Sequence, residues 1–210
     1  MAVSTLAFAL FAGLSVGYAV EHQLKISPGR CSGAPEFDFT ESINAYLRRI
    51  PNNITVPINP EQTWQMGIKI SSSEVTGLAS LWAYKRYHTF CAGNSTLMEA
   101  VVFADDPLTF SLNWKSCTGH RGKLATGVSS SKLRLYFMPE PTHEDPTKVI
   151  MYRMEPESLD HPVLFVEGMP SGLRGLVSIL NVLAMPHMEL FWRRFLGVDV
   201  MSVLRDDLKI

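Results

Sequence analysis

The amino-acid sequence predicts an α+β protein in which a curled antiparallel β-meander wraps around a long C-terminal helix, with a short N-terminal helix. Three features lead to this expectation: an amphipathic segment near the N-terminus, alternating apolar and polar residues in the middle, and a long apolar stretch near the end. A chain of 210 residues, 46% of them apolar, is long enough to bury one core. We therefore expect a single domain.

The N-terminal helix is expected over ESINAYLRRI, residues 41–50. Helical spacing places four apolar residues on one face of this segment: Ile43, Tyr46, Leu47 and Ile50. Asp38 or Thr40 can cap its start, because a side-chain oxygen there can accept a hydrogen bond from a free backbone N–H. Pro51 ends it, since the residue before a proline is driven out of the helical conformation.

The middle of the chain predicts antiparallel strands, because apolar and polar residues alternate with a period of two. The alternation is clear in residues 64–71, 108–115 and 132–137. Residues 81–91, 96–105 and 148–155 are also strand-like, so six segments are expected to form strands. The links between them are mostly short and contain Gly, Pro, Asn and Asp, which is typical of a meander. A single apolar face indicates a sheet that covers a core on one side.

A helical stretch is expected from Ser171 or Gly172 to the C-terminus, with a kink or break near Pro186. The part before the proline is apolar nearly all round, so it must be covered nearly all round. A flat sheet cannot do this. A sheet curled around the helix can, and so can a sheet on one side with lipid on the other.

The same stretch is not expected to span a membrane. Only 14 uncharged residues separate Arg174 from Glu189, whereas a span needs about 20. Pro186 interrupts the run, and the segment after it is amphipathic.

Residues 1–19 predict a secretory signal peptide. Leu6 to Val16 is an uncharged apolar core, and Gly17 and Ala19 place small residues at both positions that a signal peptidase reads. Cleavage after Ala19 leaves a single lipid-binding-like domain over residues 20–210, secreted to the extracellular space. The segment before the core lacks Lys and Arg, so an uncleaved anchor is the alternative.

In a secreted protein, N-glycosylation motifs can carry glycans and cysteines can form disulfides. Asn53 and Asn94 each begin a motif without proline in the middle, so we expect both to be glycosylated. Three cysteines, Cys31, Cys91 and Cys117, suggest one disulfide and one remaining thiol.

A meander places Cys91 and Cys117 at one rim of the sheet, two strand spacings (roughly 9–10 Å) apart. Bending of the loops could close that distance, so Cys91–Cys117 is the preferred disulfide. The alternative is a disulfide between Cys31 and either Cys91 or Cys117.

The layout of the chain resembles that of the arthropod group 7 mite allergens, which are relatives of the takeout and juvenile-hormone-binding proteins in the tubular lipid-binding superfamily. ESINAYLRRI resembles the N-terminal helix, GIKISSSEVTGLASL and LMEAVVFADDPLTFSLNW resemble two hairpins, and LVSILNVLAMPHMELFWRRFLGVDVMSVLRDDL resembles the C-terminal helices. The resemblance covers about residues 36–208. It implies a secreted tick or mite protein, with lipid between a super-rolled sheet and a long helix. Takeout-type proteins carry a paired N-terminal disulfide, whereas only Cys31 lies near this N-terminus.

The expected function is therefore binding of an apolar, lipid-like small molecule between sheet and helix. The candidate lining comprises Trp64, Met66, Ile68, Phe110, Leu112 and Trp114 from strands, with Leu180, Leu183, Phe191 and Phe195 from helices. An apolar strand face under an apolar helix is also what an ordinary core contains. The alternative is a secreted, salivary protein that acts on a host or microbial protein through its surface, without a ligand.

Other classes of function are not supported by the sequence. The one G-x-S-x-G match, residues 13–17, lies within the predicted signal peptide, and the sequence has no H-E-x-x-H motif. His187-Met-Glu189 lacks the cysteine ligands of a zinc deaminase, so we expect no enzyme, cofactor or metal. A net charge of −1 without a basic cluster argues against nucleic acid as a partner.

Overall fold

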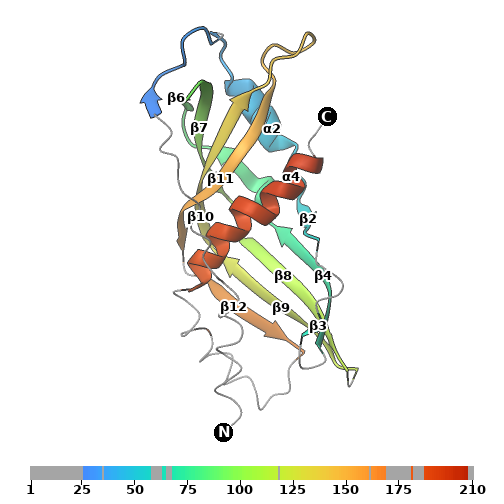
Figure 1. The fold of residues 1–210 in the computed structure, drawn as a ribbon. Helices are drawn as coiled ribbons and strands as arrows, with labels where there is room; N and C mark the ends of the chain where they lie inside the picture. The colour runs from blue at the N-terminus through green and yellow to red at the C-terminus, as the bar shows by residue number, and fades with distance from the viewer. Residues whose placement is uncertain are drawn as a thin grey trace.

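A computed structural model describes residues 26–34, 36–57, 63–64, 68–117, 119–160, 162–168, 181 and 187–207. The predicted signal peptide, Met66, Leu180 and Leu183 lie outside these residues. Two antiparallel sheets curve about a long C-terminal helix, with a short helix α2 (Thr40–Arg48) at their side (Figure 1). The predicted α+β fold class, with a curled sheet around a long C-terminal helix, is confirmed.

Sheet A has the strand order β1-β6-β7-β10-β11, with β5 also paired to β7. Its strands are β1 (Ile26–Pro28), β5 (Leu81–Ala83), β6 (His88–Ala92), β7 (Ser95–Ala104), β10 (Ser130–Pro139) and β11 (Val149–Asp160). Apolar and polar residues alternate in β10, and alternate residues of β7 (Met98, Ala100 and Val102) are at most 1% exposed, so one face of the sheet is buried.

Sheet B has the strand order β12-β9-β8-β4-β2, with β3 also paired to β4. Its strands are β2 (Asn53–Thr55), β3 (Thr63–Trp64), β4 (Ile68–Thr76), β8 (Leu108–Ser116), β9 (Arg121–Val128) and β12 (Val163–Glu167). The chain passes from one sheet to the other five times: after β1, after β4, after β7, after β9 and after β11. Strands that follow one another in sequence therefore often belong to different sheets.

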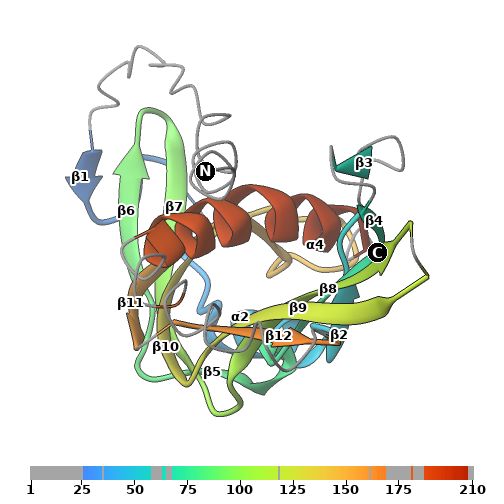
Figure 2. The same cartoon turned by 90° about the horizontal axis from the view of Figure 1, so that it is seen from below.

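The C-terminal helix is α-helical over residues 187–194, π-helical over η3 (Phe195–Val200), and α-helical again over α4 (Met201–Asp207). It lies across the open side of the curved sheets (Figure 2). Four apolar residues on one side of this amphipathic segment are fully buried: Trp192, Leu196, Val200 and Leu204. The amphipathic pattern therefore identifies the face that packs on the sheets.

Helix α2 closes the core from the other side. Ile43 and Leu47 are both 2% exposed, as the amphipathic pattern predicts. The backbone N–H of Thr40 donates to a carboxylate oxygen of Asp38 at 3.0 Å, so Asp38 satisfies one donor at the start of the helix.

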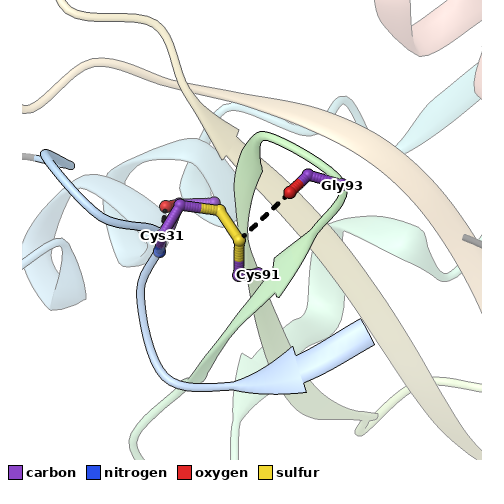
Figure 3. Close-up of a disulfide and its surroundings, with 4 residues drawn as sticks. Cys31, Cys91 and Gly93 are labelled. Carbon is purple, nitrogen blue, oxygen red and sulfur yellow. Dashed lines mark hydrogen bonds between the residues drawn. A yellow bond between two sulfur atoms is a disulfide. The ribbon is translucent and has the colours of Figure 1, made fainter. Parts of the chain in front are cut away.

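The disulfide joins Cys31 to Cys91, with their Cα atoms 4.9 Å apart (Figure 3). The preferred pairing of Cys91 with Cys117 is therefore wrong, and the competing pairing with Cys31 is the one present. Cys91 lies in β6 of sheet A, whereas Cys117 follows β8 of sheet B, so the two do not share a rim. Cys117 is a free, exposed thiol.

The N-terminal segment is held at the edge of sheet A by this disulfide and by a short strand. Ser27 of β1 lies opposite Cys91 in the ladder. The backbone N–H of Cys31 donates to the hydroxyl oxygen of Thr96 at 3.0 Å.

An ion-pair cluster lies on sheet A between β10 and β11. The Arg134 guanidinium and the Lys132 ammonium donate to opposite carboxylate oxygens of Glu157, at 3.1 and 2.6 Å. Hydrogen bonds from Arg134 and then Lys132 hold the pKa of Glu157 at about 2, because both stabilise the ionised carboxylate.

Candidate functional site

The inner face of sheet B carries the strand residues that the sequence predicted as a ligand wall. Phe110, Leu112 and Trp114 are alternate residues of β8, so they share one face. In the ladder, Leu112 lies opposite Leu124 of β9, and Thr126 lies opposite both Phe110 and Leu164 of β12. We call this surface the sheet B apolar face, defined by Phe110, Leu112, Trp114, Leu124, Leu164 and Val166.

Burial falls along β8 from its first residue towards its end. Leu108, at the start of β8, is 0% exposed, whereas Phe110, Leu112 and Trp114 are half-buried. Leu124 on the neighbouring strand is also half-buried. Part of the apolar face is therefore closed core, and part remains open to contact with a further molecule.

Aromatic side chains of the C-terminal helix close one end of the face. The ring centroid of Phe110 lies 4.4 Å from that of Phe195 and 5.5 Å from that of Phe191. Phe191 and Phe195 stack with their ring planes only 10° apart. Phe195 is 4% exposed and Phe191 is 36% exposed, so the cluster extends from the core to the surface.

Trp192 fixes the helix against sheet B. Its side chain is 0% exposed and its indole N–H donates to the hydroxyl oxygen of Thr126 at 3.3 Å. A buried indole donor needs such a partner, so Thr126 gives the helix a defined position on β9.

Trp114 packs over Gly122, which lies directly opposite it in the ladder. A Cβ atom added to Gly122 would lie 2.4 Å from the indole of Trp114 and 2.2 Å from the carbonyl oxygen of Glu167. Both distances are far below van der Waals contact, so only glycine leaves room for the indole.

Asn181 binds the edge of sheet B. Its side-chain carbonyl oxygen accepts from the backbone N–H of Leu164 at 2.6 Å, and its amide donates to the carbonyl oxygen of Leu164 at 2.9 Å. The side chain thus takes the place of a neighbouring strand along β12. This gives a structural role to one of the two polar residues in the apolar stretch.

The polar groups within the sheet B apolar face already have partners. The Ser73 hydroxyl, opposite Leu112 in the ladder, donates to the backbone carbonyl of Val56, and Thr126 accepts from Trp192. The chemical character of this face is therefore apolar.

The structure brings together five of the ten predicted lining residues: Phe110, Leu112, Trp114, Phe191 and Phe195. For Trp64 and Ile68 the structure describes the backbone, in which they lie opposite one another. Leu124 and Val166 were not predicted, although the alternation Leu124-x-Thr126-x-Val128 is a short strand signal that would have found β9.

Two cavities of the described residues lie elsewhere and contain none of the sheet B apolar face. The larger, about 970 Å³, lies between α2 and β11 and is lined by four carboxylates and three cations. The smaller, about 680 Å³, lies between β11 and the C-terminal helix.

Asn53 in β2 and Asn94 in the turn after β6 are both exposed, so a glycan at either position would point into solvent. Glycosylation of both stays a prediction. Within the described ranges, no group of three or more His, Cys, Asp or Glu residues could hold a metal ion. In the same part of the chain, no helix has the length and apolar character needed to cross a bilayer.

Neither a protein-family model nor a curated protein matches this chain. The assignment of a function therefore depends on the geometry of the site.

Proposed function

We propose that the protein is a secreted glycoprotein that binds an apolar, lipid-like ligand on the sheet B apolar face, beside the C-terminal helix. The observation that carries the proposal is the row of half-buried apolar side chains, Phe110, Leu112, Trp114 and Leu124, that begins at the aromatic cluster of the helix. Apolar side chains that remain accessible beside a closed core are typical of a ligand wall.

The resemblance to group 7 mite allergens points in the same direction, because it implies a curled sheet around a long helix with an apolar molecule between them. The accessible aromatic ring of Phe191 would provide one end of such a site. Secretion remains part of the proposal and follows from the predicted signal peptide.

Native mass spectrometry of gently purified protein tests the proposal. We expect a bound lipid in the spectrum and, after its removal, uptake of a fatty acid or a sterol. Leu112→Glu should weaken this uptake by at least about tenfold, because it places a carboxylate against an apolar ligand.

Asn113→Glu is the matched control, since Asn113 is the next residue of β8, lies on the opposite face and is exposed. It should bind as the original protein does, and both variants should unfold cooperatively. Absence of bound lipid together with no uptake after lipid removal would refute the proposal. Equal weakening by both variants would show that the ligand does not contact this face.

One observation favours the alternative of a surface that acts on a host or microbial protein. Trp82, Tyr84 and Phe103 form an aromatic cluster with ring centroids 5.4–6.3 Å apart, in which Trp82 is 43% and Tyr84 is 62% exposed. Such residues are frequent in the centres of protein interfaces. A specific protein retained from host plasma or microbial extract by the original chain, and not by Tyr84→Ala, would support this alternative. Equal retention by both would remove it.

A further inference from the structure

The smaller cavity is a groove whose lining is rich in arginine. Arg153 from β11 and Arg193, Arg194 and Arg205 from the C-terminal helix line it, and Glu155 is its one acidic lining residue. We call it the arginine groove. The complete chain carries a net charge of −1, so this concentration of cations is local.

The carboxylates around the groove leave a cationic surplus. Glu155 pairs with Arg153, Glu189 lies 3.4 Å from Arg193, and Asp199 interacts with Arg194. The groove is lined by four guanidinium groups, one more than these three carboxylates. Arg205 donates to the backbone carbonyl of Tyr152 and lies 5.9 Å from the centroid of the Tyr152 ring, which holds it in the groove.

Apolar side chains project into solvent beside these cations. Leu190 is 64% exposed and Val198 is 58% exposed, and both line the groove from the same helix as Arg193 and Arg194. Large apolar side chains are rarely left so open on a helix that packs on a core. Exposed apolar residues next to arginines are typical of helices that lie in the interface of an anionic bilayer.

We propose that the arginine groove is the surface by which this protein docks on an anionic phospholipid bilayer. Guanidinium groups bind lipid phosphates through paired hydrogen bonds, and the anionic surface attracts them from a distance. Leu190 and Val198 then reach past the headgroups into the edge of the acyl region. The docking does not require a ligand on the sheet B apolar face, so it stands or falls separately from the function proposed above.

Co-sedimentation with vesicles tests the docking. The complete mature protein should bind vesicles of phosphatidylcholine mixed with phosphatidylserine, should bind phosphatidylcholine alone far more weakly, and should be released by high salt. Each arginine near such a surface contributes about a fivefold gain in partitioning, so Arg193→Ala with Arg194→Ala should weaken binding about 25-fold. Leu190→Ser should also weaken binding to the mixed vesicles. It should reduce the salt dependence of that binding less than the double arginine variant does.

Arg48→Ala with Arg86→Ala is the matched control. It removes two exposed arginines that, like Arg193, pair with a carboxylate, and neither lines the groove. This control should bind the mixed vesicles as the original protein does, and circular dichroism should show that both double variants are folded.

Four results with vesicles alone would overturn the proposal: no binding to the mixed vesicles, equal binding to neutral vesicles, equal loss in the two double variants, or unchanged binding in the groove variant. Displacement by a soluble phosphate ester would be a fifth. In the last part of the experiment, soluble glycerol 3-phosphate is added to compete with the vesicles for the protein. If it displaces the protein from vesicles, the groove is a site for a free phosphate ester and not a bilayer surface. If it does not, the bilayer is the binding partner.

Discussion

Loss of the Cys31–Cys91 disulfide should destabilise the protein by about 4 kcal/mol. The two cysteines are 60 residues apart, so the disulfide restricts a long loop of the unfolded chain. For a loop of this length the entropy of closure corresponds to about 4 kcal/mol at room temperature. A single domain is typically stable by only about 5–15 kcal/mol, so the effect is a large fraction of the total.

Urea unfolding of Cys31→Ser with Cys91→Ser, followed by tryptophan fluorescence, measures this loss. The midpoint of unfolding should fall strongly. Addition of a reductant should lower the midpoint of the original protein and leave that of the double variant unchanged. Cys117→Ser should unfold as the original protein does, because Cys117 is exposed and outside the disulfide.

The comparison also distinguishes the two pairings. Cys31→Ser alone removes the same disulfide as the double variant and should be destabilised by a similar amount, whereas Cys117→Ser leaves the disulfide intact. Full stability of Cys31→Ser alone, or a peptide map that links Cys91 to Cys117, would refute the reasoning. It would mean that the N-terminal segment is not attached to β6.

Three further changes test the packing of sheet and helix. Trp192→Ala should cost about 3–5 kcal/mol in chemical unfolding, because the side chain is 0% exposed and the change leaves a large cavity; a loss below 1 kcal/mol would contradict its role in fixing the helix on sheet B. Gly122→Ala should cost about 1–3 kcal/mol and shift the fluorescence of Trp114, since the new Cβ overlaps the indole; an unchanged emission spectrum would count against this contact. Glu157 has a pKa of about 2 in the folded protein, against 4.5 ordinarily, so its ionised form contributes stability above about pH 4.5 that is lost as pH falls towards 2. Glu157→Gln should therefore show a smaller loss of stability over that pH range in thermal unfolding, and an identical pH profile would disprove the ion-pair contribution.

The local elements follow closely from the sequence. Alternation found β8 and β10, strand-like composition found β7 and β11, and the helical spacing of apolar residues found the buried face of the C-terminal helix. These signals are local, because burial of one face imposes its period directly on neighbouring residues. The strand β9 was not predicted, because its alternation is short and Thr126 stands at a buried position where an apolar residue is expected. The role of Thr126 depends on Trp192, 66 residues away.

The candidate site could be predicted only in part. The strand residues of β8 were identified because their alternation is strong, and Phe191 and Phe195 because they are large and apolar. The partners from β9 and β12 could not be assigned, since which strands lie beside β8 depends on pairings between distant segments. The arginine groove was also not foreseen, because Arg153 and Arg193 come together only when the helix packs on β11.

The sequence by itself determined that this chain is an α+β protein with period-two strands and an amphipathic C-terminal helix. The tertiary structure alone decided that the strands divide between two sheets, that Cys91 pairs with Cys31, and that Phe110 meets the rings of the helix. The physical reason is the separation along the chain of the residues that make contact. Secondary structure reflects contacts between near neighbours in the chain, whereas sheet order, disulfide pairing and binding surfaces depend on which distant segments bury their apolar faces together.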